Sequence, residues 1–286
     1  MPITPEDIVK KTGDLPTLPH VATKVMTLVS DPETSAKDLQ EAIITDQGMT
    51  AQILKISNSA MFGLKREVKT LTHAIMILGF NTIRSIVLAA AGKKLYTKKG
   101  APNTGFKEKL IWENSIGSAL IARGLAEQFR GMDKEEAFIG GLMHNLGKTV
   151  LNAKLPQKYS EIMVASYNES RPIHLLEQDY LGFDHAELGY CIVKQWNLSE
   201  SLAESIRHYL APENAPQEHR VQTAIISLAT HYCLDLGLGV GQATPMEEQE
   251  LGEIPAILKI DLPRLLRWRE IITEKMEKDR ALINSF

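Results

Sequence analysis

Apolar side chains recur along this chain at the spacing of a helix. Between residues 21 and 29 they return every three or four positions, and Pro32 ends the run. Ser35 followed by Asp38 resembles a capping box, which marks the start of a second helix. No stretch alternates apolar and polar residues in the manner of a half-buried strand. The pattern therefore predicts an all-α fold.

The same spacing predicts helices through most of the remaining chain. They cover residues 49–56, 70–78, 81–90, 110–125, 138–151, 172–181, 186–196, 202–209, 221–236 and 262–283. The predicted helix over 138–151 contains Gly140, Gly141 and Gly147. A glycine inside a helix costs about 1 kcal/mol relative to alanine. We therefore expect another part of the fold to approach this helix closely.

The segment from Gly92 to Gly105 is rich in lysine and then in glycine and proline, which indicates a boundary between two helical lobes. The first lobe covers residues 1–99, and the second covers residues 106–236. Residues 237–286 form an acidic loop and an amphipathic C-terminal helix. The apolar face of that helix either closes the core or pairs with a second subunit in a homodimer.

Composition narrows the class of protein. The chain has 286 residues and a formal net charge of −3, so we do not expect a nucleic-acid-binding protein. Its two cysteines are not in paired spacing, and its N-terminus lacks the features of a secretory signal. Polar residues interrupt the apolar stretch 221–240, which excludes it as a membrane span. We expect a cytoplasmic protein without a membrane partner.

Eight short motifs follow one another along the chain. They are Leu15–Pro19, Ile44–Thr50, Asn58–Gly63, Ala74–Gly79, Trp112–Ser115, Gly141–Lys148, Asp184–Gly189 and Ile206–His208. In this order they resemble the HDOD family, and the resemblance extends roughly from Leu15 to Leu236. It implies an all-α fold similar to that of HD-domain phosphohydrolases. It also implies a regulatory role in bacterial signalling.

The resemblance also shows which residues of this chain match the metal ligands of the related enzymes. The related HD enzymes bind a metal through a histidine, a His-Asp pair and a distal aspartate. The matching positions are Asn114, His144, Asn145 and Thr230, and only His144 is of the required type. Amide and hydroxyl oxygens bind divalent cations less strongly than carboxylates do. No cofactor is therefore expected.

Three further residues belong to the same pocket by resemblance. His185 and His208 match positions that hold a second metal in cyclic-di-GMP-cleaving relatives, and Lys148 matches the lysine after the His-Asp pair. The imidazoles of His144, His185 and His208 could together hold Zn²⁺. Alternatively they form hydrogen bonds within the core. In a third interpretation, His144, Lys148 and His208 bind an anion without hydrolysing it.

The function predicted from these observations is a non-catalytic regulatory module of signal transduction. It would bind a signalling protein, or an anionic small ligand such as a nucleotide or a phosphorylated metabolite. The alternative is a metal-dependent phosphohydrolase that uses the remaining histidines on a cyclic dinucleotide or another phosphoester. A third class is an interaction scaffold that binds no small ligand.

Overall fold

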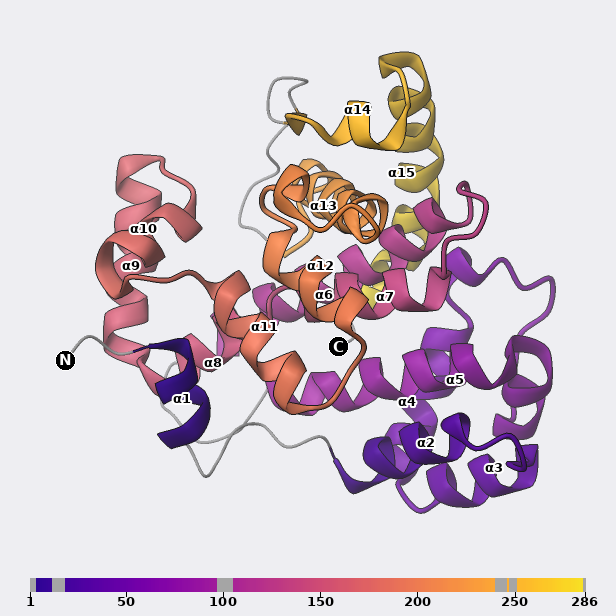
Figure 1. Ribbon diagram of the computed structural model, residues 1–286. Coiled ribbons are helices and arrows are strands. Elements are labelled where there is room, and N and C mark those ends of the chain that lie inside the picture. The colour runs from indigo at the N-terminus through magenta and orange to yellow at the C-terminus, as the bar shows by residue number, and fades with distance from the viewer. Residues whose placement is uncertain (1–3, 12–18, 97–104, 240–245, 247–250, 285–286) are drawn as a thin grey trace.

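A computed structural model describes residues 4–11, 19–96, 105–239, 246 and 251–284. Within these ranges the chain forms helices and turns and no strand, which confirms the all-α prediction (Figure 1). Leu15 to Leu18, the lysine-rich residues 97–104 and most of the acidic loop after Gly239 lie outside the described residues.

The N-terminal lobe consists of short helices around an apolar centre. Its elements are α1 (Pro5–Lys11), α2 (His20–Ser30), α3 (Ala36–Ile44), α4 (Gln47–Ser57), the 3-10 turn η1 (Ala60–Phe62) and α5 (Leu71–Tyr96). Val25, Leu39, Ile43 and Ile53 are fully buried between these helices. The exception is α1, which packs against α11 (His185–Gln195) of the second lobe, as Figure 1 shows.

Helix α5 connects the two lobes. Gly79 leaves the helical conformation (φ 80°, ψ 167°), so the break predicted there is present, and Asn81 follows within the helix. The stretch Leu71–Gly92 is the one described segment long and apolar enough to cross a membrane, although 61% of it is buried inside the fold. It therefore serves as a core helix.

The second lobe surrounds the long helix α6. Its elements are α6 (Gly105–Ala126), α7 (Lys134–Met143), α8 (Leu146–Lys154), α9 (Pro156–Glu169), α10 (Ile173–Leu181), α11 (His185–Gln195), α12 (Glu200–His208), the turn η2 (Pro212–Asn214) and α13 (Arg220–Asp235). Helices α7 and α13 pack against α6. Helices α9 and α10 form a hairpin at the left of Figure 1.

The single helix predicted over 138–151 is wrong, because the chain breaks at His144 and Asn145 into α7 and α8. The expected close approaches are present. A Cβ on Gly141 would lie 2.6 Å from the carbonyl oxygen of Ser118 on α6, and one on Gly147 would lie 1.9 Å from that of His185 on α11. These two glycines let α7 and α8 pack directly on the neighbouring backbones.

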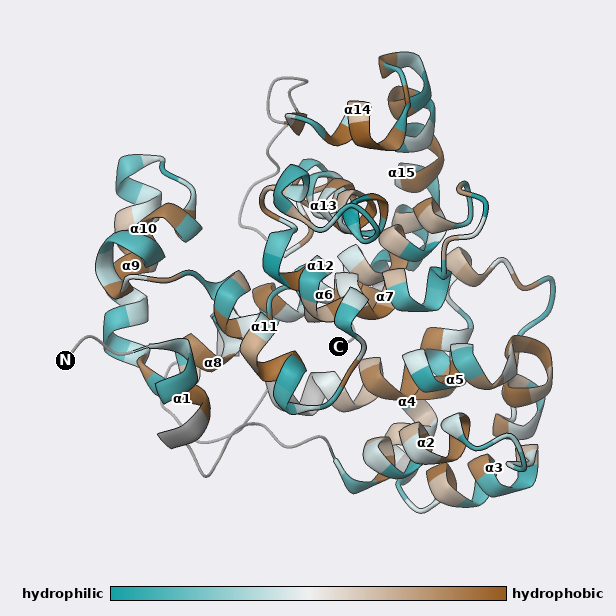
Figure 2. Cartoon of the chain, viewed as in Figure 1, coloured by the Kyte–Doolittle hydropathy of each residue, from teal (hydrophilic) through white to brown (hydrophobic). Residues whose placement is uncertain are grey.

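The C-terminal elements are α14 (Ile254–Leu258) and α15 (Leu262–Asn284). Helix α15 buries Leu265, Trp268, Ile272 and Met276 against the second lobe, so its apolar face closes the core. Figure 2 shows hydrophobic positions concentrated where the helices pack.

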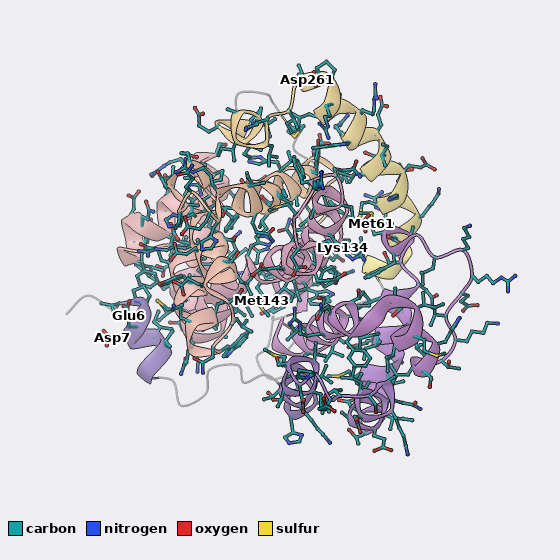
Figure 3. All side chains as sticks on the ribbon, turned by 45° about the vertical axis from the view of Figure 1, so that its right-hand side comes forward. Glu6, Asp7, Met61, Lys134, Met143 and Asp261 are labelled. Atoms are coloured by element: carbon teal, nitrogen blue, oxygen red, sulfur yellow. The ribbon has the colours of Figure 1, made fainter. Side chains whose placement is uncertain are left out.

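Asp279, near the end of α15, fixes this helix to the N-terminal lobe. Its carboxylate accepts hydrogen bonds from Ser59 Oγ (2.7 Å) and from the backbone N–H groups of Ala60 (2.6 Å) and Met61 (3.2 Å). The contact joins residues about 220 positions apart, and Figure 3 shows Met61 beside α15.

Candidate functional site

Three of the predicted site residues lie together where α6 meets the junction of α7 and α8. Asn145 Nδ2 donates to Asn114 Oδ1 at 2.8 Å, and His144 Nε2 lies 3.0 Å from the same oxygen. The Asn114 amide in turn donates to the carbonyl oxygen of Leu238 at 3.1 Å. All three side chains are almost completely buried. Three of the four residues at the expected metal positions are therefore in contact with one another.

His144 has an oxygen at each ring nitrogen. Its Nδ1 lies 2.7 Å from the carbonyl oxygen of Gly141, and its Nε2 faces Asn114. Burial, and then the positive charge of Lys148, lower the pKa of His144 to about 3. The ring is thus neutral at physiological pH and carries one N–H, which supplies a hydrogen to only one of its two contacts.

A second buried network lies next to this cluster. Glu177 on α10 accepts hydrogen bonds from Tyr159 Oη (2.9 Å), His185 Nδ1 (2.5 Å) and the backbone N–H of His185 (2.8 Å). The other ring nitrogen of His185, Nε2, is in a hydrogen bond with Tyr209 Oη, which lies 2.5 Å away. The rings of Tyr209 and His144 meet edge to face with centroids 5.1 Å apart, so the two networks touch.

The charges in this second network are set by burial and by neighbouring groups. Burial by itself would raise the pKa of Glu177, but its contacts with His185 and the charge of Lys148 bring it below the usual value. Burial, followed by the charge of Glu177, raises the pKa of Tyr209 well above its usual range. Tyr209 therefore stays protonated, and Glu177 holds the negative charge of the site.

Lys148 extends from α8 near both networks. Burial lowers the pKa of its ammonium, and the charge of Glu177 opposes that shift. Its side chain is half-buried, and no hydrogen bond or ion pair joins its ammonium to another residue within the described parts of the chain. The carboxamide oxygen of Asn145 is also buried without a described partner. The pocket thus contains a cation and an acceptor that the fold itself leaves unused.

Two predicted site residues are engaged elsewhere. His208 Nε2 lies 3.2 Å from Glu204 on its own helix, where both side chains are partly exposed. Thr230 Oγ1 donates to the carbonyl oxygen of Ser227, one turn earlier in α13. Both side chains therefore use partners on their own helices.

Comparison with known proteins identifies the family. The sequence profile of the HDOD domain matches residues 15–212. The chain belongs to the HDOD family. A curated relative, an uncharacterized protein of Treponema pallidum (strain Nichols), is 24% identical over 224 residues. The match covers 78% of this chain, which spans only 42% of the length of that relative.

Solved structures share the fold of this HDOD chain. An HDOD domain protein of unknown function from Geobacter sulfurreducens superposes with a TM-score of 0.79 and 21% identity, covering 98% of this chain and 95% of the other. A Shewanella amazonensis SB2B protein named "Putative phosphohydrolase" gives 0.73 and 24%, with 96% and 97% coverage. A Marinobacter aquaeolei VT8 protein named "Putative signal transduction protein" gives 0.71 and 18%, with 97% and 61% coverage.

The donors in this HDOD pocket do not fit the divalent metal that related HD enzymes hold. His144 faces an amide and a carbonyl oxygen, and both nitrogens of His185 are in hydrogen bonds. His208 pairs with Glu204. Within the described residues, no three His, Cys, Asp or Glu side chains are grouped to hold an ion.

Sequence reasoning missed two residues of this pocket, Glu177 and Tyr209. Tyr209 directly follows His208, and the structure directs the tyrosine rather than the histidine toward His185. Glu177 lies eight residues before His185, and it is fully buried. The motif containing His208 could have pointed to Tyr209, whereas no motif pointed to Glu177.

Proposed function

We propose that this HDOD chain is a non-catalytic regulatory module of signal transduction that acts in the cytoplasm through a protein partner or an anionic small ligand. The observation that carries the proposal is the hydrogen-bonded cluster of Asn114, His144 and Asn145. In an HD enzyme these positions would supply two histidines and an aspartate to an ion that activates water. Here the amide of Asn145 donates to the carboxamide oxygen of Asn114, which also faces the single remaining histidine.

The Lys148 ammonium supports an anionic ligand. The Lys148 ammonium is partly removed from water and has no described partner, which is unfavourable unless water or an anion contacts it. The nearby Glu177 carboxylate already accepts three hydrogen bonds. A phosphate or carboxylate group next to Lys148 would supply the missing contacts. A nucleotide or a phosphorylated metabolite has this chemistry.

Metal content and hydrolysis test the non-catalytic part of the proposal. After purification without chelators, we expect well under one equivalent of Mn, Fe, Zn or Mg, and no turnover of cyclic di-GMP, nucleoside triphosphates or a generic phosphodiester. Elemental analysis and product chromatography measure these quantities. Stoichiometric metal together with turnover that disappears in His144→Ala would instead establish the alternative, a phosphohydrolase.

A thermal-shift screen of nucleotides and phosphorylated metabolites tests the ligand. A ligand that binds the folded protein raises its melting temperature. We expect Lys148→Met to remove that shift with little change in the melting temperature of the free protein. Lys154→Met is the matched control, because Lys154 is also half-buried on α8 but lies two turns away. An equal ligand shift in all three proteins would contradict the role of Lys148, and no shift in any of them would favour a scaffold.

A further inference from the structure

A groove lies between the N-terminal lobe and the C-terminal helix, and it is formed by elements other than those of the HDOD pocket. Helix α4, residues 67–69 before α5, and Lys278 and Asp279 of α15 line it. Its volume is about 560 Å³. Because its walls come from both ends of the chain, a ligand there would contact the N-terminal lobe and α15 at once.

Hydrogen bonds hold both walls in place. On one side, Asn58 Nδ2 donates to the carbonyl oxygen of Val68 at 2.9 Å, and the Val68 N–H donates to Asn58 Oδ1 at 2.7 Å. On the other side, the three hydrogen bonds to Asp279 fix α15 against η1. The groove is therefore already formed before any ligand binds, which lowers the entropic cost of binding.

The groove is positively charged although the whole chain has a net charge of −3. Lys55, Lys69 and Lys278 line it from three different elements, and each is exposed. Asp279 also lines the groove, but its carboxylate is 3% exposed and its oxygens already accept hydrogen bonds from Ser59 and η1. Glu67 is the remaining acidic residue in the lining.

Two of these lysines, Lys69 and Lys278, form exposed ion pairs. Lys69 lies 3.8 Å from Glu67, and Lys278 lies 2.7 Å from Glu274, in pairs whose side chains are all more than 60% exposed. Exposed ion pairs of this kind contribute little to stability. A ligand carrying several carboxylates can therefore compete with Glu67 and Glu274 for both ammonium groups.

We propose that this groove docks an acidic peptide segment of a partner protein. Carboxylate side chains would pair with lysines on both walls, while the half-buried Leu54 offers an apolar contact between them. A nucleic acid fits less well, because no aromatic side chain lines the groove for base stacking. Docking here does not depend on the proposed function of the HDOD pocket.

Fluorescence anisotropy of a labelled octaglutamate peptide tests the groove. Against the full chain at low salt, we expect saturable binding that weakens as salt is added. The triple variant Lys55→Gln, Lys69→Gln, Lys278→Gln should bind at least tenfold more weakly, and Lys278→Gln alone about threefold more weakly. The control is Lys24→Gln, Lys37→Gln, Lys158→Gln, which changes the net charge equally at exposed positions elsewhere. It should stay within twofold of the parent.

Three outcomes would overturn the proposal. The first is no binding of octaglutamate to the parent protein, and the second is equal weakening in the groove and control variants. The third is tighter binding of a single-stranded oligonucleotide of the same charge with the same dependence on the three lysines. None of them bears on metal content or on the Lys148 screen, so the two proposals fail separately.

Discussion

The buried imidazole of His144 makes the stability of this protein depend on pH. Burial and Lys148 lower its pKa to about 3 in the folded chain, against an ordinary value of 6.5. The unfolded chain therefore takes up a proton first as the pH falls below 6.5, and stability is lost from there downward. Between pH 7 and pH 5 the loss from this residue is about 2 kcal/mol.

We expect His144→Gln to remove this part of the pH dependence. Urea unfolding followed by circular dichroism at pH 7 and pH 5 measures it as a smaller difference between the two unfolding free energies. His20→Gln is the control, because His20 is an exposed residue at the start of α2 and its replacement should leave the parent difference intact. A His144→Gln protein that loses as much stability as the parent between these pH values would show that the imidazole is not held neutral.

The sequence motifs predicted some of the residues of the site. They did not predict which way the side chains point. Asn114, His144 and Asn145 were predicted together from their motifs, and they lie together. Glutamate side chains usually lie on the protein surface. Only the structure shows that Glu177 is buried and bonded to His185. Successive side chains of a helix are rotated by about 100° around its axis. At the end of α12, the neighbours His208 and Tyr209 therefore face different surroundings.

At the scale of an element, Gly147 sets how closely α8 approaches α11. A Cβ at this position would lie 1.9 Å from the carbonyl oxygen of His185, so the backbones would have to separate. We expect Gly147→Ala to lower the unfolding free energy by about 3 kcal/mol, since backbone atoms yield less readily than side chains. Urea unfolding measures the loss.

Gly48 in α4 provides the matched control for this prediction. Its nearest outside atom to an added Cβ is Asp46 Oδ1 at 3.4 Å, an ordinary contact. Gly48→Ala should therefore leave stability unchanged or raise it by up to about 1 kcal/mol through helix propensity. Equal effects of the two alanines would mean that α8 and α11 can separate without cost.

Helix starts were easier to predict than helix interruptions. The Ser35–Asp38 capping box is present with both of its hydrogen bonds, because its partners are three residues apart. The break between α7 and α8 was missed, because His144 and Asn145 leave the helical course to reach Asn114 on α6. Helices α9 and α14 were missed as well. The apolar period continues through such a break, so periodicity alone predicts one helix.

At the scale of the whole molecule, the lobes are joined by buried polar contacts. Arg123 on α6 pairs with Glu135 on α7 at 3.2 Å, and Thr82 of α5 donates to the same carboxylate at 3.0 Å. The guanidinium of Arg123 also lies 4.4 Å from the centre of the Phe62 ring in η1. The turn η1 is therefore in direct contact with the second lobe as well as with α15.

Asp279 is the contact through which α15 holds η1, so Asp279→Asn should loosen one end of the molecule selectively. An amide keeps the shape of the carboxylate but loses its charge, and its NH₂ group faces groups that are themselves donors. Hydrogen bonds to a charged group contribute about 1.5 to 3 kcal/mol each, so we expect a loss of at least 2 kcal/mol. Hydrogen exchange should become faster in the last turns of α15 and in residues 59–62, while α8 and α11 keep their protection.

Glu277→Gln is the control, because it removes an exposed charge from the same helix without breaking a contact to η1. Faster exchange that spreads equally over α8 and α11 would mean that Asp279 supports the whole fold rather than this one junction, and unchanged exchange in α15 would mean that its apolar face alone holds it in place.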